Sequence, residues 1–185
     1  MRRTQMEKTY KVRIEGNTPL LQHRFNGGDG EQTTKKKAST MKENDVEETI
    51  YRLPDGTIYQ PGDCIKQSMI EAGKAFKKGK SNLSKPSGSF LMVLPDAIPH
   101  INQEWVKDRR AVVIPSTKGR VMRNRAKFED WTLDFEIKCL DDDELDKTTI
   151  QNLLEHSGKY VGIGDYRPQK KGMFGTFSVT NFEEA

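Results

Sequence analysis

Residues 131–139 read WTLDFEIKC and alternate without a break between apolar and polar side chains. A period of two indicates a β-strand with one buried face, because successive side chains point to opposite sides of a sheet. The predicted buried face carries Trp131, Leu133, Phe135, Ile137 and Cys139. Residues 10–15, YKVRIE, show the same alternation. We therefore expect two half-buried strands here, and the rest of the fold is built around them.

Further elements are predicted from the segments around these strands. Pro61 suits a first helical position, and apolar residues follow it at helical spacing in a helix ending near residue 78: Ile65, Met69, Ala72 and Phe76. A second, short helix is expected around residues 150–154, ending near Gly158. Short apolar or alternating runs predict the remaining strands, at residues 90–94, 111–114, 121–128 and 173–179.

The order of these elements predicts an α+β fold. Without its loops the chain reads βαββαβ, the ferredoxin-like or RRM-like unit with a four-stranded antiparallel sheet and two helices on one side. Residues 26–48 are almost wholly polar and predict a mobile inserted loop. Pro-Asp-Gly at residues 54–56 predicts an inserted β-hairpin over residues 51–59. A length of 185 residues fits one domain spanning residues 1–185.

Composition excludes several classes of protein. Hydrophobic residues make up 34% of the chain and charged residues 31%, and the mean hydropathy is −0.81. No apolar run approaches the roughly 18–20 residues that a membrane-spanning helix needs, so no membrane association is expected. Two distant cysteines give no disulfide framework and indicate a reducing cytoplasm. The histidines and cysteines lack metal-ligand spacing, so neither a metal nor another cofactor is expected.

Charge is distributed unevenly along the chain. The formal net charge is +4, but residues 74–127 hold 13 Lys and Arg against three acidic residues. That middle segment therefore carries +10 and the remainder −6. Segregation of this kind is typical of proteins that bind nucleic acid, although any single lysine run can equally be a solvated surface.

The strongest candidate site within the basic segment is the predicted strand at residues 121–128. Arg123, Arg125 and Lys127 would share one face of it, about 6.6–7 Å apart, which nearly matches the phosphate spacing of an extended nucleic-acid strand. Lys118 and Arg120 would extend the row. We expect these five cations to hold phosphates.

The second candidate site is the glycine-rich segment that follows the last predicted helix. Gly162 and Gly164 would let the backbone approach a phosphate closely. Aromatic side chains that could stack on bases and cations that could hold phosphates surround these glycines: Tyr160, Tyr166, Arg167, Lys170, Lys171 and Phe174. Two histidines leave a catalytic alternative open, because His23 or His156 could act as a general base in RNA cleavage.

Two motifs carry a resemblance to known proteins. With its predicted topology and residues 158–168, GKYVGIGDYRP, the chain resembles the RAMP superfamily, the RNA-handling proteins of CRISPR effector complexes. It is also similar to uncharacterised phage and prophage proteins with TPLLxHRF (residues 18–25) and VGIGxxRPxxxGxFGxF (residues 161–177). Among RAMP proteins it looks most like backbone subunits that polymerise along a guide RNA. That resemblance implies that residues 26–48 or 51–59 engage a neighbouring subunit.

These patterns together predict a non-catalytic subunit that binds single-stranded RNA or DNA largely without regard to sequence. It would form a homo-oligomer or filament, as a CRISPR-type effector backbone or as a phage strand-binding or annealing protein. One alternative is a metal-independent RNA-processing endoribonuclease using His23 or His156. The other is a protein–protein assembly factor, whose basic middle segment docks on an acidic partner.

Overall fold

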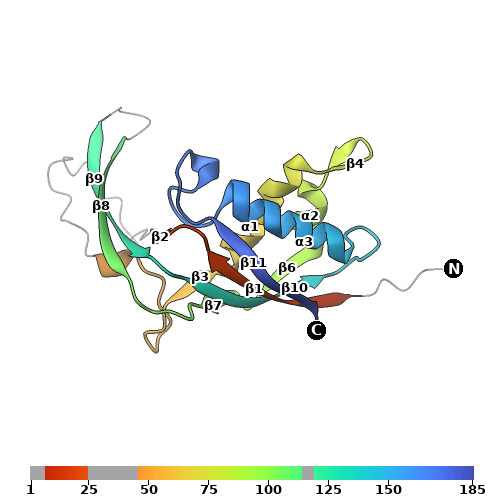
Figure 1. The fold of residues 1–185 in the computed structure, drawn as a ribbon, viewed down its shortest axis with the longest axis horizontal. Helices are drawn as coiled ribbons and strands as arrows, with labels where there is room; N and C mark the ends of the chain where they lie inside the picture. The colour runs from red at the N-terminus through yellow and green to blue at the C-terminus, as the bar shows by residue number, and fades with distance from the viewer. Residues whose placement is uncertain (1–6, 25–45, 114–118) are drawn as a thin grey trace, which may run out of the picture.

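The main sheet has four antiparallel strands in the order β11-β1-β10-β6. The computed structural model describes residues 7–24, 46–113 and 119–185 (Figure 1). The sheet strands are β1 (Lys8–Gly16), β6 (Leu91–Leu94), β10 (Thr132–Cys139) and β11 (Phe177–Glu184). β1 and β10 occupy the centre, so the two strands with the clearest alternation are the ones with neighbours on both sides. Both predictions are confirmed.

Register explains the alternation in these two strands. Val12 lies opposite Phe135 and Ile14 opposite Leu133, and all four side chains are buried. The intervening pair, Arg13 and Asp134, faces the opposite side of the sheet. Trp131, the first residue of the predicted strand, lies just before β10 and donates from Nε1 to the Thr18 carbonyl oxygen at 2.9 Å.

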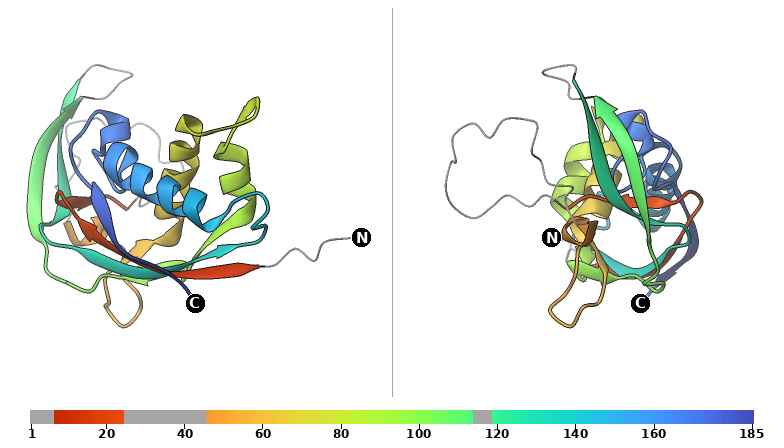
Figure 2. Two further views of the ribbon diagram at one scale, coloured as in Figure 1. Left: turned by 45° about the vertical axis from the view of Figure 1, so that its right-hand side comes forward. Right: turned by 90° about the vertical axis from the view of Figure 1, so that its left-hand side faces the viewer.

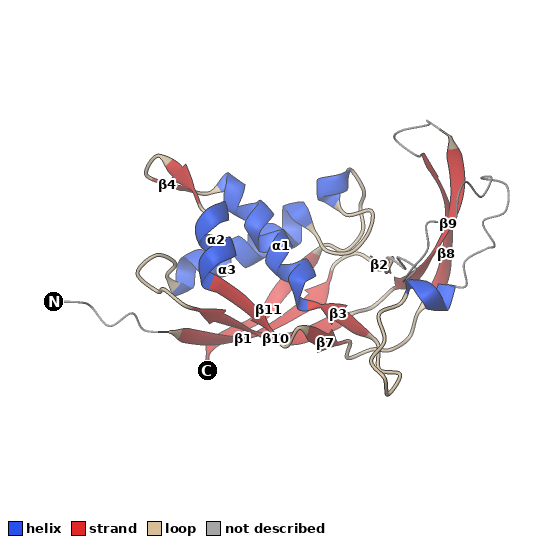
Figure 3. Ribbon diagram, turned by 180° about the vertical axis from the view of Figure 1, so that it is seen from behind, coloured by secondary structure: helices blue, strands red, loops and turns tan. Residues whose placement is uncertain are grey.

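Three helices pack on one face of the main sheet (Figure 1; Figure 3). They are α1 (Gly62–Ala72), α2 (Ser84–Phe90) and α3 (Lys147–His156). α3 begins where the Asp146 carboxylate accepts a hydrogen bond from the Thr149 amide at 2.7 Å, which satisfies one of the free amides of its first turn. The helices bury one apolar face against the sheet: Ile65, Met69, Ile150, Leu153 and Leu154. The α+β class is confirmed.

A second antiparallel sheet stands at one end of the main sheet (Figure 2). Its order is β2-β9-β8, formed by β2 (Leu20–Gln22), β9 (Arg120–Phe128) and β8 (Val106–Val113). The predicted strand at residues 121–128 therefore exists but belongs to this second sheet. Only the base of β9 pairs with β2, so β8 and β9 continue outward as a two-stranded ribbon.

Smaller elements complete the chain. Two short sheets pair β3 (Tyr59–Pro61) with β7 (Ala97–Pro99) and β4 (Lys77–Lys78) with β5 (Ser81–Asn82). The other helical segments are η1 (Val46–Thr49), η2 (Gly73–Ala75), the π-helical η3 (Ser157–Val161) and η4 (Pro168–Lys170). No helix in the described ranges is both long and apolar enough to cross a membrane.

Several sequence-based boundaries need correction. The predicted loop before residue 90 contains α2, so Phe90 ends a helix and the strand begins at Leu91. The last strand begins at Phe177, because residues 162–176, which we call the glycine-rich loop, precede it. The hairpin over residues 51–59 forms but is short: Gly56 has a φ of +89°, Arg52 and Ile58 form an antiparallel bridge, and the Leu53 and Tyr59 amides donate across it to the Thr57 and Tyr51 carbonyl oxygens. Within the polar insertion, residues 26–45 lie outside the described residues, whereas Val46 is buried in η1.

Candidate nucleic-acid interface

A cavity of about 670 Å³ lies between β9, the glycine-rich loop and the first two turns of α1. We call it the arginine cleft, because Arg123, Arg125 and Arg167 all line it. Its floor is formed by buried side chains: Leu21, Gln22, Gln60, Ser68 and Ile163. The cleft therefore brings together two sequence-predicted sites that are about 40 residues apart in the chain.

The three arginines differ in how their charges are balanced. Arg125 is only 4% exposed, and its Nε lies 2.5 Å from Oδ2 of Asp165. Arg167 donates to the Gly164 carbonyl oxygen and to the side chain of Gln169, which are uncharged acceptors. Within the described residues, Arg123 and Arg167 have no carboxylate partner. Asp63 also lines the cleft, so its three guanidinium groups and two carboxylates give a formal charge of +1 among the described residues.

Gly164 allows the glycine-rich loop to pack directly on β2. Its φ is +75°, and a Cβ there would lie 2.6 Å from the Leu21 carbonyl oxygen. The same carbonyl accepts a hydrogen bond from the Asp165 amide at 2.9 Å. This contact places Asp165 against Arg125 in the cleft, so the predicted close approach of this loop is made to the protein's own β2 strand.

The two candidate histidines lie in different places. His23 lines the arginine cleft just after β2. Burial and the nearby Arg125 charge lower the pKa of His23, so its imidazole is neutral at pH 7 and can accept a proton. His156 ends α3 and packs against the rings of Phe76 and Tyr160, at centroid distances of 5.3 and 4.7 Å. His156 is not among the residues that line the cleft.

Outside the cleft, Tyr166 and Phe174 form a ring pair with centroids 6.5 Å apart. Tyr166 is exposed, whereas Phe174 is buried and the Arg110 guanidinium lies 4.4 Å from its ring centroid. Lys170 and Lys171 are exposed at the end of this loop, in and just after η4. Tyr160 is exposed beside Lys159, in η3.

The predicted row of cations on β9 is not uniform. Lys127 pairs with Glu129 at 2.5 Å, Arg125 is buried, and Arg120 is exposed near the outer end of the ribbon. Lys118 lies outside the described residues. Arg123 is therefore the member of the row that both lines the cleft and lacks a described carboxylate partner.

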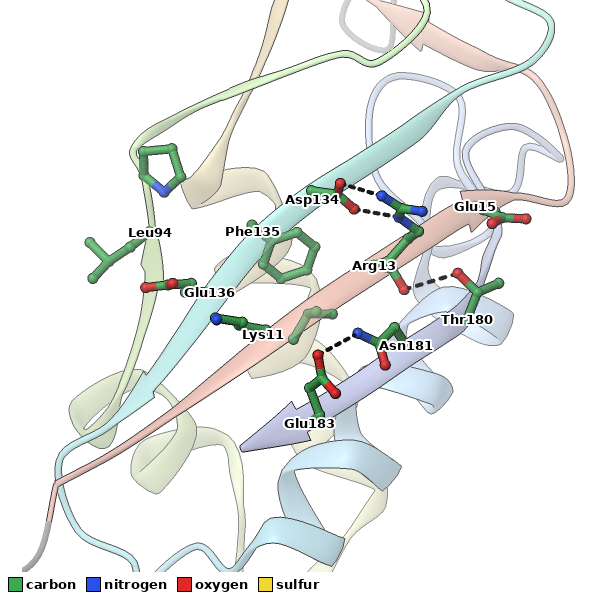
Figure 4. Close-up of a pocket in the computed structure, with 12 residues that line it drawn as sticks. Lys11, Arg13, Glu15, Leu94, Asp134, Phe135, Glu136, Thr180, Asn181 and Glu183 are labelled. Atoms are coloured by element: carbon green, nitrogen blue, oxygen red, sulfur yellow. Dashed lines mark hydrogen bonds and ion pairs between the residues drawn. The ribbon is translucent and has the colours of Figure 1, made fainter. Parts of the chain in front are cut away.

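The helix-free face of the main sheet carries a second, larger depression of about 1100 Å³ (Figure 4). Two cations and four carboxylates line it, which gives a formal charge of −2. Arg13 donates two hydrogen bonds to the Asp134 carboxylate, each at 2.6 Å. A surface of this kind attracts phosphates less than the arginine cleft does.

Some cleft residues carried no usable signal in the sequence. Gln22 and Gln60 form its buried floor, where the Gln22 side-chain amide donates to the Gln60 side chain at 3.1 Å. Cys64 and Asp63 come from the first turn of α1, which shares the cleft with β9 only in the folded chain. Asp165 lies within the glycine-rich motif, and this position was the one feature of the sequence that could have pointed to a role in the site.

Comparison with known proteins yields a structural match. No protein-family model matches the sequence, and no curated protein sequence matches it. The fold is similar to that of a chain in the cryo-EM structure of the type III-B Cmr-beta complex bound to cognate target RNA. The TM-score is 0.62 and the identity 13%, over 96% of this chain. The chain spans 60% of the length of that relative, and at this identity the likeness concerns the fold.

Proposed function

We propose that this chain is a non-catalytic subunit that binds single-stranded nucleic acid, either RNA or DNA, largely without regard to sequence. The observation that carries this proposal is the convergence of Arg123, Arg125 and Arg167 from two distant segments on one cleft. Cations that converge on a concave surface focus a positive potential and attract phosphates. We assign the binding of phosphates to these three side chains.

The core topology supports a RAMP-like ferredoxin fold. Along the chain, the core elements follow the order β1, α1, β6, β10, α3, β11. In the sheet the strands lie in the order β11-β1-β10-β6 and are antiparallel throughout. This is the connectivity of the βαββαβ unit, with α2 and the second sheet as additions. The likeness to a chain of an RNA-bound complex is in keeping with this assignment.

The proposed binding surface continues from the cleft along the β8–β9 ribbon. Arg120 on the ribbon and Lys170, Lys171 and Tyr166 on the glycine-rich loop are exposed, so the two segments that supply the cleft arginines also carry accessible cations and one accessible ring outside it. An exposed aromatic ring can stack on a base of any sequence, which suits binding without sequence preference. We further propose that copies assemble side by side on one strand.

Fluorescence anisotropy with an internally labelled single-stranded RNA, the same sequence as DNA, and a duplex tests this proposal. We expect the single strands to bind better than the duplex and the affinity to fall steeply with salt. The Arg123→Gln/Arg167→Gln variant should bind at least tenfold more weakly, since each charged contact contributes about 1.5–3 kcal/mol. Lys80→Gln/Lys85→Gln is the charge-matched control, because both lysines are exposed around β5 and α2 and do not line the cleft.

The same experiment distinguishes nucleic-acid binding from the alternative that the chain is a protein–protein assembly factor. If the protein binds neither RNA nor DNA at low salt, or if the control variant loses as much affinity as the cleft variant, the proposal is wrong. Copurification of an acidic protein in place of nucleic acid would then favour the assembly factor.

One observation favours endoribonuclease activity as a second candidate function. His23 is a neutral imidazole beside Arg125 in a cleft that can hold a phosphate, so it can accept the proton of a 2′-hydroxyl. Incubation of labelled RNA in EDTA tests this candidate. Cleavage that is lost in His23→Ala and kept in His156→Ala would support it, and intact RNA with the wild-type protein would remove it.

A further inference from the structure

Arg125 has a hydrogen-bond donor that the described protein leaves unused. Its guanidinium is nearly buried and bonds through Nε to Asp165, whereas Nη1 is buried and has no acceptor among the described residues. A buried charged N–H without an acceptor is unfavourable, so such groups in folded proteins call for an additional partner. Arg125 lines the arginine cleft, so an anion bound there lies beside this buried donor.

The first turn of α1 also borders the cleft. Pro61 precedes this helix and no side chain caps it. The Gly62 amide donates to the Asp96 carbonyl oxygen at 2.6 Å. The next two amides, of Asp63 and Cys64, belong to the first turn and have no intrahelical acceptor, and both residues line the cleft. The positive end of the α1 dipole therefore lies at this edge of the cleft, where the Asp63 carboxylate in the same turn offsets part of it.

The shape of the cleft favours one kind of anion. Three guanidinium groups and two carboxylates, Asp63 and Asp165, give it a formal charge of +1, and buried side chains are among the residues that line it. A phosphodiester within a strand carries one charge and must continue on both sides, which an open groove accommodates better. A phosphomonoester carries between one and two charges at pH 7, offers three free oxygens and projects from the end of a strand.

From these observations we infer that the arginine cleft binds the terminal phosphomonoester of a nucleic-acid strand. This inference rests on the proposed function and names the part of the ligand that enters the cleft. Arg123 and Arg167 hold the phosphate oxygens, and Arg125 donates from Nη1. The cavity of about 670 Å³ lies within the range of sites that hold a small molecule, so the terminal nucleotide can enter with its phosphate. Tyr51, half-buried in the same cavity, offers a ring for that nucleotide.

Competition binding with three strands of one sequence tests the inference. The strands carry a 5′-phosphate, a 3′-phosphate or hydroxyls at both ends, and each displaces an internally labelled strand at fixed salt. We expect one phosphorylated strand to bind about tenfold or more tightly than the hydroxyl-ended strand, because a dianion meets several charged donors at once. Treatment of that strand with a phosphatase should abolish the difference.

Variants assign the preference to the cleft. Arg167→Gln and Arg123→Gln should each reduce the preference for the phosphorylated end, whereas Lys80→Gln/Lys85→Gln should leave it unchanged. Arg125→Gln is included only if its circular dichroism spectrum matches that of the wild-type protein, since it also breaks the Asp165 ion pair. Equal binding of all three strands by the wild-type protein would overturn this inference while leaving the proposed function intact. Absence of binding to any strand would overturn the proposed function itself.

Discussion

Arg125 on β9 and Asp165 in the glycine-rich loop form an ion pair that joins the second sheet to the segment between α3 and β11. The arginine is 4% exposed and the aspartate side chain 35%, so the contact is shielded mainly on the arginine side. Removal of the carboxylate leaves a buried guanidinium with no charged partner among the described residues. The pair therefore bears on both the stability of the fold and the shape of the arginine cleft.

Loss of this ion pair should destabilise the protein more than loss of an exposed one. We expect Asp165→Asn to reduce the free energy of unfolding by about 2–3 kcal/mol, somewhat less than for a fully buried pair. Asp134→Asn removes the partner of Arg13, where both side chains are 49% exposed. That change should cost about 0–1 kcal/mol. Urea denaturation of both variants measures the difference, and equal losses would contradict the prediction.

Two glycines with similar backbone angles should respond differently to alanine. Gly79 has φ +63° and a Cβ there would meet nothing within 4 Å, whereas the Cβ of an alanine at position 164 would meet the Leu21 carbonyl oxygen. Gly79→Ala should cost about 1–2 kcal/mol from backbone strain alone. Gly164→Ala should cost about 1–3 kcal/mol more, because the loop must move away from β2. Thermal unfolding compares the two, and anisotropy shows whether nucleic-acid binding falls only in Gly164→Ala.

A buried histidine should make stability depend on pH. Desolvation lowers the pKa of His100 from 6.5 to about 4. The unfolded chain therefore binds a proton that the folded chain does not, and stability falls as the pH drops from about 6.5 toward 4. The loss attributable to His100 is about 3 kcal/mol. His100→Gln should be less stable at pH 7 and show a smaller decline over this range, and a His100 pKa near 6.5 by NMR would refute the prediction.

Two cations on β9 should contribute unequally to nucleic-acid binding. Lys127 is paired with Glu129, whereas Arg123 lines the cleft without a described carboxylate partner. Arg123→Gln should therefore weaken binding and reduce the slope of log K against log salt by about 1. Lys127→Gln should leave that slope nearly unchanged. Anisotropy at four salt concentrations gives both slopes, and a larger effect of Lys127→Gln would show that the phosphate path follows the base of β9 instead of the cleft.

The sequence was informative wherever local periodicity matched tertiary burial. Residues 10–15 and 131–139 alternate because one face of each strand packs on the helices. α2 was missed because its residues, SKPSGSF, contain Ser, Gly and Pro and little helical apolar spacing. The helix forms there because Leu83 and Ser87 are buried against the core, which is a property of the whole fold.

The candidate site shows the same division between local and long-range information. The sequence predicts Arg123, Arg125 and Arg167 as cations that bind phosphates. It could not reveal that Asp165, 40 residues away, packs on Arg125 and buries it. Alternation along β9 predicts which side chains share a face of the strand. It does not predict that the glycine-rich loop, by packing on β2, comes to lie against Arg125 on one of those faces.

The glycine-rich loop is fastened to the core at several points. Ser68 on α1 donates to the Gly162 carbonyl oxygen at 3.0 Å, and the Gly175 amide donates to the Pro19 carbonyl oxygen at 2.8 Å. Because these hydrogen bonds already hold the glycine-rich loop in place, the loop loses little conformational entropy when a ligand binds in the cleft. The arginine cleft is thus preorganised, and the rate of association should be governed by diffusion and electrostatic attraction, with no slow rearrangement of this loop beforehand.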